Sequence, residues 1–287
     1  MPIIVLASET GWHTDELVRA IGARGLEPLL LPWEANIGRM GGSSGVSNSG
    51  RLLREARAVI ARIIPGGSLE QIIYRVDTLH RLEEEGVRVV NTARAIERTV
   101  DKAWTSAILE RAGLPTPETV ACERAEDAFT AFHAMGDVVV KPIFGSMGLG
   151  MSRVSDEDMA WRVFRVVETV RGVYYLQRFI PHQGRDVRAF VVGGRIVGAI
   201  ERSAPGWRTN FSRGGKVRSI ALPAAWADLA IRAAEAVGTE YAGVDLLPAE
   251  DGTVYILEVN GIPGWEGLQQ TTGIDVAAAI VEQVLSR

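Results

Sequence analysis

Two carboxylates and one amide near the end of the chain have the types and spacing of a cation site. Side chains alternate along a β-strand, so Glu258 and Asn260 are expected on one face, together with Val254 and Ile256. A glutamate on an apolar face is costly to bury unless a positive group meets it, and Asp245 on the preceding predicted strand can reach the same point. Oxygen ligands without histidine or cysteine suit Mg²⁺, which shares its coordination with nucleotide phosphates. A surface hairpin with polar tips is the alternative, and the spacing favours the cation.

A lysine followed by a glycine-rich loop is a second candidate for chemistry. Lys141 ends a predicted strand, and the loop Gly145-Ser146-Met147-Gly148-Leu149-Gly150 follows it. Such a loop can bring backbone N–H groups against a phosphate, while the lysine supplies a point charge. The loop lacks both the Gly-Lys-Ser/Thr of a Walker A motif and the Rossmann spacing, so a plain turn is the alternative.

A group of cations and amides lies in the strand-rich part of the chain. The pair Gly193-Gly194 predicts a tight hairpin, which would place Arg188 and Arg202 on adjoining strands. Arginine matches the geometry of carboxylate and phosphate groups, so an anionic reaction centre and a solvated sheet face are both open readings. The members of this group are Asp186, Arg188, Arg202, Arg208, Asn210 and Arg213.

Composition narrows the class of protein. The 287 residues are 47% hydrophobic and 23% charged, which is typical of a folded chain with two or three lobes. The net charge of −4 offers no basic excess for nucleic acid. Cys122 has no partner for an internal disulfide, and the four histidines show no zinc-ligand spacing. We find neither a signal sequence nor an apolar run of the ~18 residues that a membrane span needs, so we expect a cytoplasmic protein.

The elements that must position these residues begin with an α/β lobe, which ends near residue 97. Apolar residues at helical spacing then predict a helix that buries Val100, Trp104 and Ile108. The Gly/Ser-rich segment 38–50 is expected to be a surface loop without a catalytic role.

A further helix is predicted after residue 155, where Ser155 and Asp158 have the spacing of a capping box. Its expected buried face consists of Met159, Val163, Val166, Val167 and Val170.

Seven ordered motifs, from about residue 58 to the end of the chain, resemble the ATP-grasp superfamily. They are Asp101-Lys102, Val140-Lys141-Pro142 with the glycine-rich loop, Gln177-Arg178-Phe179-Ile180, Asp186-Val187-Arg188, Asn210, Gly243-Val244-Asp245 and Glu258-Val259-Asn260. The segments 206–210 and 258–267 resemble the RimK-like branch, which contains the α-L-glutamate ligases.

The resemblance implies an α/β plus α+β chain with the three-lobed ATP-grasp fold. Residues 1–97 would form a Rossmann-like pre-ATP-grasp domain. Residues 98–176 would form ATP-grasp subdomain A with the phosphate loop, and residues 177–287 would form subdomain B with the metal and catalytic residues.

The resemblance also implies ATP with two Mg²⁺ or Mn²⁺ ions, and a role for each motif. The lysines would contact phosphates, the glycine-rich loop would close over them, and the segment 177–180 would hold adenine by its backbone. The implied nucleotide-binding residues are Lys102, Lys141, Gly145, Ser146, Met147, Gly148, Gln177, Arg178, Phe179, Ile180 and Asp186. The implied metal ligands are Asp245, Glu258 and Asn260, and the implied catalytic residues are Arg188, Arg202 and Asn210.

One position departs from the family pattern, because Arg178 stands where glutamate is common. Backbone contacts to adenine would survive this change, whereas the local polarity would differ.

The expected activity is ATP-dependent carboxylate–amine ligation through an acyl phosphate, with L-glutamate as the carboxylate donor and an amine or coenzyme as acceptor. Candidate substrate residues are Trp12, His13, Arg62 and Arg208. Trp12 could stack on a planar ring, which favours a tetrahydromethanopterin-like coenzyme, although Trp12 and His13 could equally pack where their helix begins.

Two other functions are open at this point. One is glutamylation of a protein C-terminus or a carrier protein. The other is a non-catalytic ATP-binding regulator, and the presence of every expected metal ligand and phosphate lysine counts against it. By resemblance we expect a homodimer or homotetramer, and we expect no nucleic-acid or membrane partner.

Overall fold

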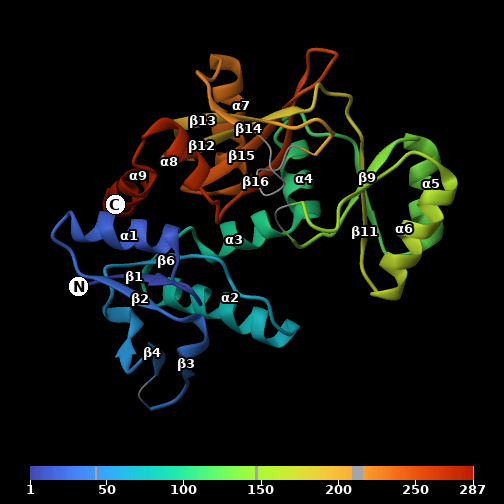
Figure 1. Cartoon of the computed structure of the whole chain (residues 1–287). Helices are drawn as coiled ribbons and strands as arrows, with labels where there is room; N and C mark the ends of the chain where they lie inside the picture. The colour runs from blue at the N-terminus through green and yellow to red at the C-terminus, as the bar shows by residue number, and fades with distance from the viewer. Residues whose placement is uncertain (43, 146–147, 209–215, 287) are drawn as a thin grey trace.

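The computed structural model describes residues 1–42, 44–145, 148–208 and 216–286, and these residues form four β-sheets with helices packed around them (Figure 1). Within these ranges, every helix is too short or too polar to cross a lipid bilayer.

The amino-terminal lobe is built on a parallel sheet in the order β2-β1-β6-β7. The central strand β1 is buried at every position, as expected of a strand covered on both faces. The strands are β1 (Ile3–Leu6), β2 (Pro28–Leu31), β6 (Ala58–Ala61) and β7 (Arg88–Val90), and the helices are α1 (Trp12–Gly22), α2 (Leu69–Glu84) and α3 (Ala93–Val100). The predicted α/β character of this lobe is confirmed.

Residues 38–39 and 45–48 of the Gly/Ser-rich segment belong to a small antiparallel sheet, which corrects the expectation of a surface loop for these residues. Asn48 is buried there, and its Nδ2 donates to the Pro32 carbonyl at 2.6 Å and to Asn36 Oδ1 at 2.7 Å. The sheet consists of β3 (Asn36–Arg39), β4 (Gly45–Asn48) and β5 (Arg51–Leu52), flanked by the 3₁₀ turns η1 (Trp33–Ala35) and η2 (Leu53–Glu55). Side-chain hydrogen bonds of this kind are not visible in composition.

The central lobe carries an antiparallel sheet in the order β10-β9-β11-β8. In Figure 1 it projects away from the rest of the chain, with α5 and α6 on its outer side. Its elements are β8 (Thr119–Cys122), α5 (Ala125–Met135), β9 (Val138–Lys141), β10 (Ser152–Val154), α6 (Glu157–Thr169) and β11 (Tyr174–Arg178). Helix α4 (Lys102–Arg111) leads into this lobe.

The carboxy-terminal lobe carries a five-stranded antiparallel sheet in the order β14-β13-β12-β15-β16. The predicted hairpin is confirmed, because Val192 pairs with Arg195 and both intervening glycines have positive φ, 56° and 71°. The elements are β12 (Arg185–Val192), β13 (Arg195–Ser203), β14 (Lys216–Ser219), α7 (Ala224–Val237), β15 (Tyr241–Pro248), β16 (Val254–Asn260), α8 (Glu266–Thr272) and α9 (Val276–Leu285).

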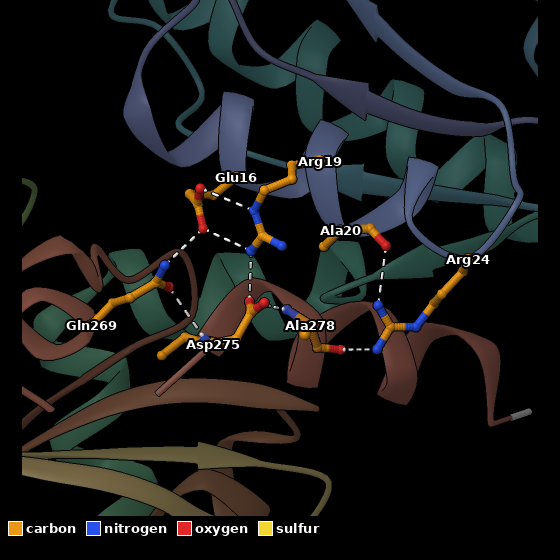
Figure 2. A network of polar contacts seen from close by, with 8 residues as sticks. Glu16, Arg19, Ala20, Arg24, Gln269, Asp275 and Ala278 are labelled. Carbon is orange, nitrogen blue, oxygen red and sulfur yellow. Dashed lines mark hydrogen bonds and ion pairs between the residues drawn. The ribbon is translucent and has the colours of Figure 1, made fainter. Parts of the chain in front are cut away.

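The end of the chain returns to the amino-terminal lobe, where α8 and α9 meet α1 through the polar network of Figure 2. Arg19 forms ion pairs with Glu16 and Asp275, each at 2.8 Å. Gln269 donates to Glu16 at 2.7 Å, and Arg24 donates to the Ala278 carbonyl at 2.8 Å. These bonds fix α1 against the last two helices.

The buried cores follow the same division. One core joins Ile3, Val5 and Leu17 of the first lobe to Phe190 and Trp265 of the last. The central lobe has a core of its own, drawn from residues 128–176. The first and last lobes are therefore packed together, and the central lobe stands apart from them. The domain boundaries at 97/98 and 176/177 stay a prediction, and the second of these falls inside β11.

Two predicted helix faces are only partly right, because Ile108 of α4 and Val163 and Val167 of α6 pack against buried cores whereas other predicted positions do not. Asp101 ends α3 and caps α4 by accepting from the Trp104 N–H at 3.0 Å. This break shifts the phase, so the buried positions of α4 are Thr105, Ser106 and Leu109, while Val100 is 45% exposed.

In α6 the cap is Asp156, and not Ser155. Phe164 takes the core position, with ring centroids 4.9 Å from Phe129 and 5.4 Å from Tyr174. Val166 and Val170 therefore lie on the exposed side.

Candidate active site

A cleft between the central sheet and the carboxy-terminal sheet gathers most of the predicted nucleotide-binding and metal residues. We refer to it as the interlobe cleft. The predicted residues that line it are Lys102, Lys141, Gln177, Arg178, Phe179, Ile180, Asp186, Arg202, Arg208, Asp245 and Glu258. Val139, Met151, His182, Trp207, Leu247 and Leu257 also line it and were not predicted.

Other predicted residues lie elsewhere. Ser146, Met147 and Asn210 fall outside the described residues. Gly145 and Gly148 flank the undescribed part of the glycine-rich loop, and both have positive φ, 140° and 67°. Arg188 and Asn260 lie on β12 and β16 beside the cleft.

The two predicted carboxylates lie opposite each other, because Asp245 on β15 pairs in register with Glu258 on β16. A β-bulge follows, since the next pair is Leu246 with Ile256 and Leu257 is skipped. The bulge inverts the alternation, so Ile256 and Val259 both enter the same buried core. Glu258 and Asn260 share a face as predicted, but Ile256 does not share it, which corrects the sequence analysis.

A chain of buried ion pairs surrounds Asp245. Arg188 binds its carboxylate through two hydrogen bonds of 2.7 Å, and Arg202 lies 3.2 Å away. Arg202 also donates two hydrogen bonds, of 2.8 and 2.6 Å, to the Asp186 carboxylate. Burial alone would raise the pKa of Asp245, but the two guanidinium groups outweigh it and lower that pKa to about 2. Asp245 is therefore ionised at neutral pH.

The residues predicted to bind metal fit a hard cation in their chemistry. Asp245 and Glu258 are carboxylates on adjoining strands, and Asn260 donates its Nδ2 to the Gly243 carbonyl at 3.3 Å, so its Oδ1 is the atom that could bind a cation. Within the described ranges, no three His, Cys, Asp or Glu side chains group closely enough to bind a metal by themselves. A cation here would depend on the amide and on ligand oxygens in addition to the two carboxylates.

Lys141 is held by a network of neutral side chains. Its Nζ donates to Gln177 Oε1 at 2.6 Å, and Gln177 Nε2 donates to Thr119 Oγ1 at 3.1 Å and to Tyr175 Oη at 3.3 Å. Ser106 on α4 completes the network, with its Oγ 2.9 Å from Tyr175 Oη. Desolvation lowers the pKa of Lys141 to about 8, and Lys102 adds to the shift while Glu258 and Asp245 oppose it.

Lys102 joins the glycine-rich loop to the carboxylates. Its Nζ donates to the Gly145 carbonyl at 2.7 Å and to the Ile143 carbonyl at 3.3 Å, and it lies 4.0 Å from Glu258 Oε1. Because Lys102 is the first residue of α4, it and Lys141 enter the cleft from different elements. Two cations therefore converge near two carboxylates, as a site for a polyanion with bound cations requires.

The segment predicted to hold adenine has most of its backbone N–H groups in use. The N–H of Arg178 donates to the Glu118 carbonyl, and the N–H of Phe179 donates to the Asp137 carbonyl, both at 2.8 Å. A backbone donor for adenine would therefore come from Ile180.

The positive charge of Arg178, the residue that departs from the family pattern, is compensated by a neighbouring carboxylate. Its guanidinium forms bonds of 2.9 and 2.5 Å to Glu118 Oε2 and donates to the Met135 carbonyl at 3.0 Å. Glu118 thus supplies beside residue 178 the negative charge that the family commonly has at this position.

Aromatic residues form one end of the cleft. Arg153 lies over the Phe179 ring at 3.5 Å from its centroid, and the Trp207 and His182 rings lie 6.3 and 5.8 Å from it. Burial lowers the pKa of His182, so this imidazole is neutral at pH 7. Nothing in the spacing of these residues along the chain indicates that they meet.

The four candidate substrate residues occupy two places. Arg208 lines the interlobe cleft, and its guanidinium lies 4.7 Å from the Trp207 ring centroid and donates to the Met151 carbonyl. Trp12, His13 and Arg62 pack around Trp265 at the junction of the first and last lobes.

His13 and Arg62 are both engaged at that junction. The backbone N–H of Trp265 donates to His13 Nε2 at 3.0 Å, and Arg62 Nη2 donates to the Pro263 carbonyl at 3.1 Å. Burial, with a smaller effect of Arg62, lowers the pKa of His13 to about 4. The described contacts of these residues join the two lobes.

Comparison with known proteins shows the family to which the chain is related. Residues 99–284 match the RimK-like ATP-grasp domain. The chain is 35% identical, over 97% of its own length and 97% of the other, to a tetrahydromethanopterin:alpha-L-glutamate ligase of Methanosarcina acetivorans. It is also 35% identical, over its whole length and 96% of the other, to a probable alpha-L-glutamate ligase of Serratia proteamaculans.

Among solved structures, the fold is shared with the ATP-grasp ligase PsnB in complex with a phosphomimetic variant of a minimal precursor, Mg and ADP. The TM-score is 0.75 at 21% identity, and the likeness covers 99% of this chain and 97% of that one.

Proposed function

The chain belongs to the RimK-like ATP-grasp family of ligases, and from that premise we propose that it joins L-glutamate to a tetrahydromethanopterin-like coenzyme through an acyl phosphate. The observation that supports this proposal most strongly is the interlobe cleft. Lysines from α4 and β9 face carboxylates and arginines from β12, β13, β15 and β16 in that cleft.

The nucleotide would be bound across the two sheets. Lys102 and Lys141 would contact its phosphates, and Ile180 and Phe179 would meet adenine. Asp245, Glu258 and Asn260 would hold two Mg²⁺ or Mn²⁺ ions, which when bound neutralise phosphate charge. Arg188 and Arg202 each use Nε and Nη2 for a carboxylate. Within the described ranges the third nitrogen, Nη1, has no hydrogen-bond partner, so it would be the atom that meets an anion.

The reaction would proceed in two displacements. A carboxylate oxygen attacks the γ-phosphorus of ATP, the bond to the β–γ bridging oxygen breaks, and ADP leaves. The amine nitrogen of the other substrate then attacks the acyl carbon, loses a proton, and expels phosphate to leave the amide. Arg188, Arg202 and Asn210 would stabilise the negative charge of both transition states, while positioning in the cleft supplies much of the rate.

The acceptor is proposed from the relative in Methanosarcina acetivorans. That likeness spans 97% of the chain, so it includes the amino-terminal lobe outside the matched RimK-like domain. Trp12, His13, Arg62 and Arg208 would contribute to the substrate site, the first three through the junction of the first and last lobes.

A protein C-terminus or carrier protein is the second candidate acceptor. The relative in Serratia proteamaculans is equally similar, and its name specifies glutamate but no acceptor. Under either candidate we propose a cytoplasmic homodimer or homotetramer that acts without nucleic acid.

The proposal is tested by ADP release with Mg-ATP and L-glutamate, in the presence of tetrahydromethanopterin, a fraction of small metabolites or a protein fraction. We expect ADP release to rise with the pterin, and mass spectrometry to show a glutamyl adduct on it. An adduct only on a protein would move the proposal to the second candidate. If no acceptor raises ADP release above that of the Asp245→Asn variant, glutamate ligation is wrong.

A further inference from the structure

A second groove lies on the outer side of α4, between α3 and α7, and shares no lining residue with the interlobe cleft. Three arginines and one tryptophan dominate it. They are Arg94 and Arg98 on α3, and Trp104 and Arg111 on α4. None of these residues has a part in the ligation proposed above.

The positive charge of this groove is only partly compensated. Arg94 lies 3.6 Å from Glu97, a loose ion pair on the surface. Arg111 is exposed, and within the described part of the chain it has no ion pair. Arg98 also lacks a carboxylate partner there, so two guanidinium groups face the groove without a counter-charge.

Arg98 has a structural bond that does not use its whole guanidinium. Its Nη1 donates to the carbonyl of Val237, the last residue of α7, at 3.3 Å. Its Nε is buried and has no partner among the described residues. A buried donor without a partner is unfavourable, and helix capping by Nη1 leaves that cost in place.

The apolar part of the groove lies beside this charge. Arg94 lies over the Trp104 ring, 4.6 Å from its centroid, and Arg98 lies 6.0 Å from it. Ile108 follows Trp104 by one helical turn and also lines the groove. The groove therefore combines the apolar side chains of Trp104 and Ile108 with guanidinium groups, one of which lies over the Trp104 ring.

We propose that this groove is a binding site for a small polyanion that carries carboxylate or phosphate groups. Arg98 supplies one guanidinium charge for the oxygens of such a group, and Arg111 supplies the second. The carbon skeleton of the ligand packs on Trp104 and Ile108. Because the two sites share no residue, this site is occupied independently of the nucleotide.

The test is isothermal titration of the full chain with citrate, and separately with inorganic phosphate, in metal-free buffer with saturating ADP. We expect one citrate per chain, and an affinity that falls as salt is raised. The tighter of the two probes identifies whether carboxylates or phosphate is preferred. Quenching of tryptophan fluorescence by citrate should disappear in Trp104→Phe.

Variants assign the binding to the groove. Arg98→Gln should weaken citrate binding roughly tenfold or more, since it removes a charge-assisted hydrogen bond. Arg111 is exposed, so Arg111→Gln should leave the fold intact. It therefore tests the site even if Arg98→Gln unfolds the protein. Arg232→Gln is the control and should leave binding unchanged, since Arg232 lies on α7 and, of the residues that the structure describes, it pairs with Asp228 alone.

Three results would overturn the proposal. One is no binding of either probe up to about 10 mM. Another is equal affinity in Arg111→Gln and wild type. The third is loss of binding when ADP is present, which would place the anion in the interlobe cleft.

Discussion

On the side of the interlobe cleft formed by β12, β13 and β15, which we call the paired wall, three charged lining residues and the adjacent Arg188 are paired with one another. On the side formed by β9 and β11, which we call the neutral wall, one lysine is held by uncharged groups. Asp186, Arg202, Asp245 and Arg188 bind each other through short double hydrogen bonds. Lys141 is bound by Gln177, which is bound in turn by Tyr175 and Thr119.

The two walls differ in whether their charged groups already have partners of opposite charge. In the paired wall, each charge is stabilised by its neighbour, so the removal of one leaves another buried and alone. In the neutral wall, no carboxylate of the described residues lies at hydrogen-bond distance from Lys141, and the pKa of Lys141 falls to about 8. A phosphate that approached Lys141 would supply the missing counter-charge. We infer that the first wall fixes geometry and that the second wall is prepared for an anion.

The largest expected effect is on the paired wall. Asp245→Asn leaves Arg188 and Arg202 without their shared carboxylate, which costs about 3–5 kcal/mol for a buried pair. We therefore expect ADP release to fall at least ~100-fold. Asp228→Asn, which alters an exposed ion pair on α7, should keep the wild-type rate. Equal rates in Asp245→Asn and wild type would remove Asp245 from the reaction.

The neutral wall is tested next by Lys141→Met. The loss of one charge-assisted hydrogen bond should weaken ATP binding about 10- to 100-fold, as measured by equilibrium titration. Lys141→Arg keeps the charge but changes its shape, so partial recovery is expected. An ATP affinity in Lys141→Met within twofold of wild type would contradict this role.

A pH series separates the two walls further. Lys141 is protonated below its pKa of about 8, so ATP affinity should decrease as the pH rises from 7 to 9. Gln177→Leu removes an acceptor that favours the charged lysine, so the pKa falls further and the decrease shifts to lower pH. The expected loss at pH 7 is about five- to tenfold. Gln270→Leu, on an exposed turn of α8, is the control. If the decrease in ATP affinity moved to higher pH in Gln177→Leu, the proposed effect of this network on Lys141 would be wrong.

The smallest effect is expected from Tyr175→Phe. The substitution removes a hydroxyl that is connected to Lys141 through two successive hydrogen bonds. ATP affinity should therefore change two- to threefold, which corresponds to a binding free energy of about 0.5 kcal/mol. Tyr74→Phe, which removes a hydroxyl bonded in the first lobe, should leave ATP affinity unchanged. A larger effect than that of Gln177→Leu would mean that Tyr175 acts on ATP by another route.

The paired wall could be anticipated from sequence better than the neutral one. Two glycines at a hairpin and charged residues on its strands show that Arg188 and Arg202 lie on neighbouring strands, which the structure confirms. The pairing of Asp245 with Glu258 followed from two adjacent strands. The bulge at Leu257 could not be seen, because alternation assumes regular pairing and a bulge is decided by the partner strand.

The neutral wall depends on residues far apart in the chain. Ser106, Thr119, Tyr175 and Gln177 meet only after α4 and two strands are packed. The type of each of these residues, taken by itself, does not indicate a functional site. The break at Asp101 also changes which side of α4 faces inward, and it is this change that places Ser106 against Tyr175.

Isotope transfer tests whether ligation in the interlobe cleft passes through an acyl phosphate. Either L-glutamate or the coenzyme is labelled with ¹⁸O in its carboxylates, and the phosphate released during amide formation is analysed by mass spectrometry. We expect one ¹⁸O to appear in the phosphate from the substrate whose carboxylate becomes the amide carbonyl, and none from the other substrate. Amide formation with unlabelled phosphate from both labelled substrates would contradict it.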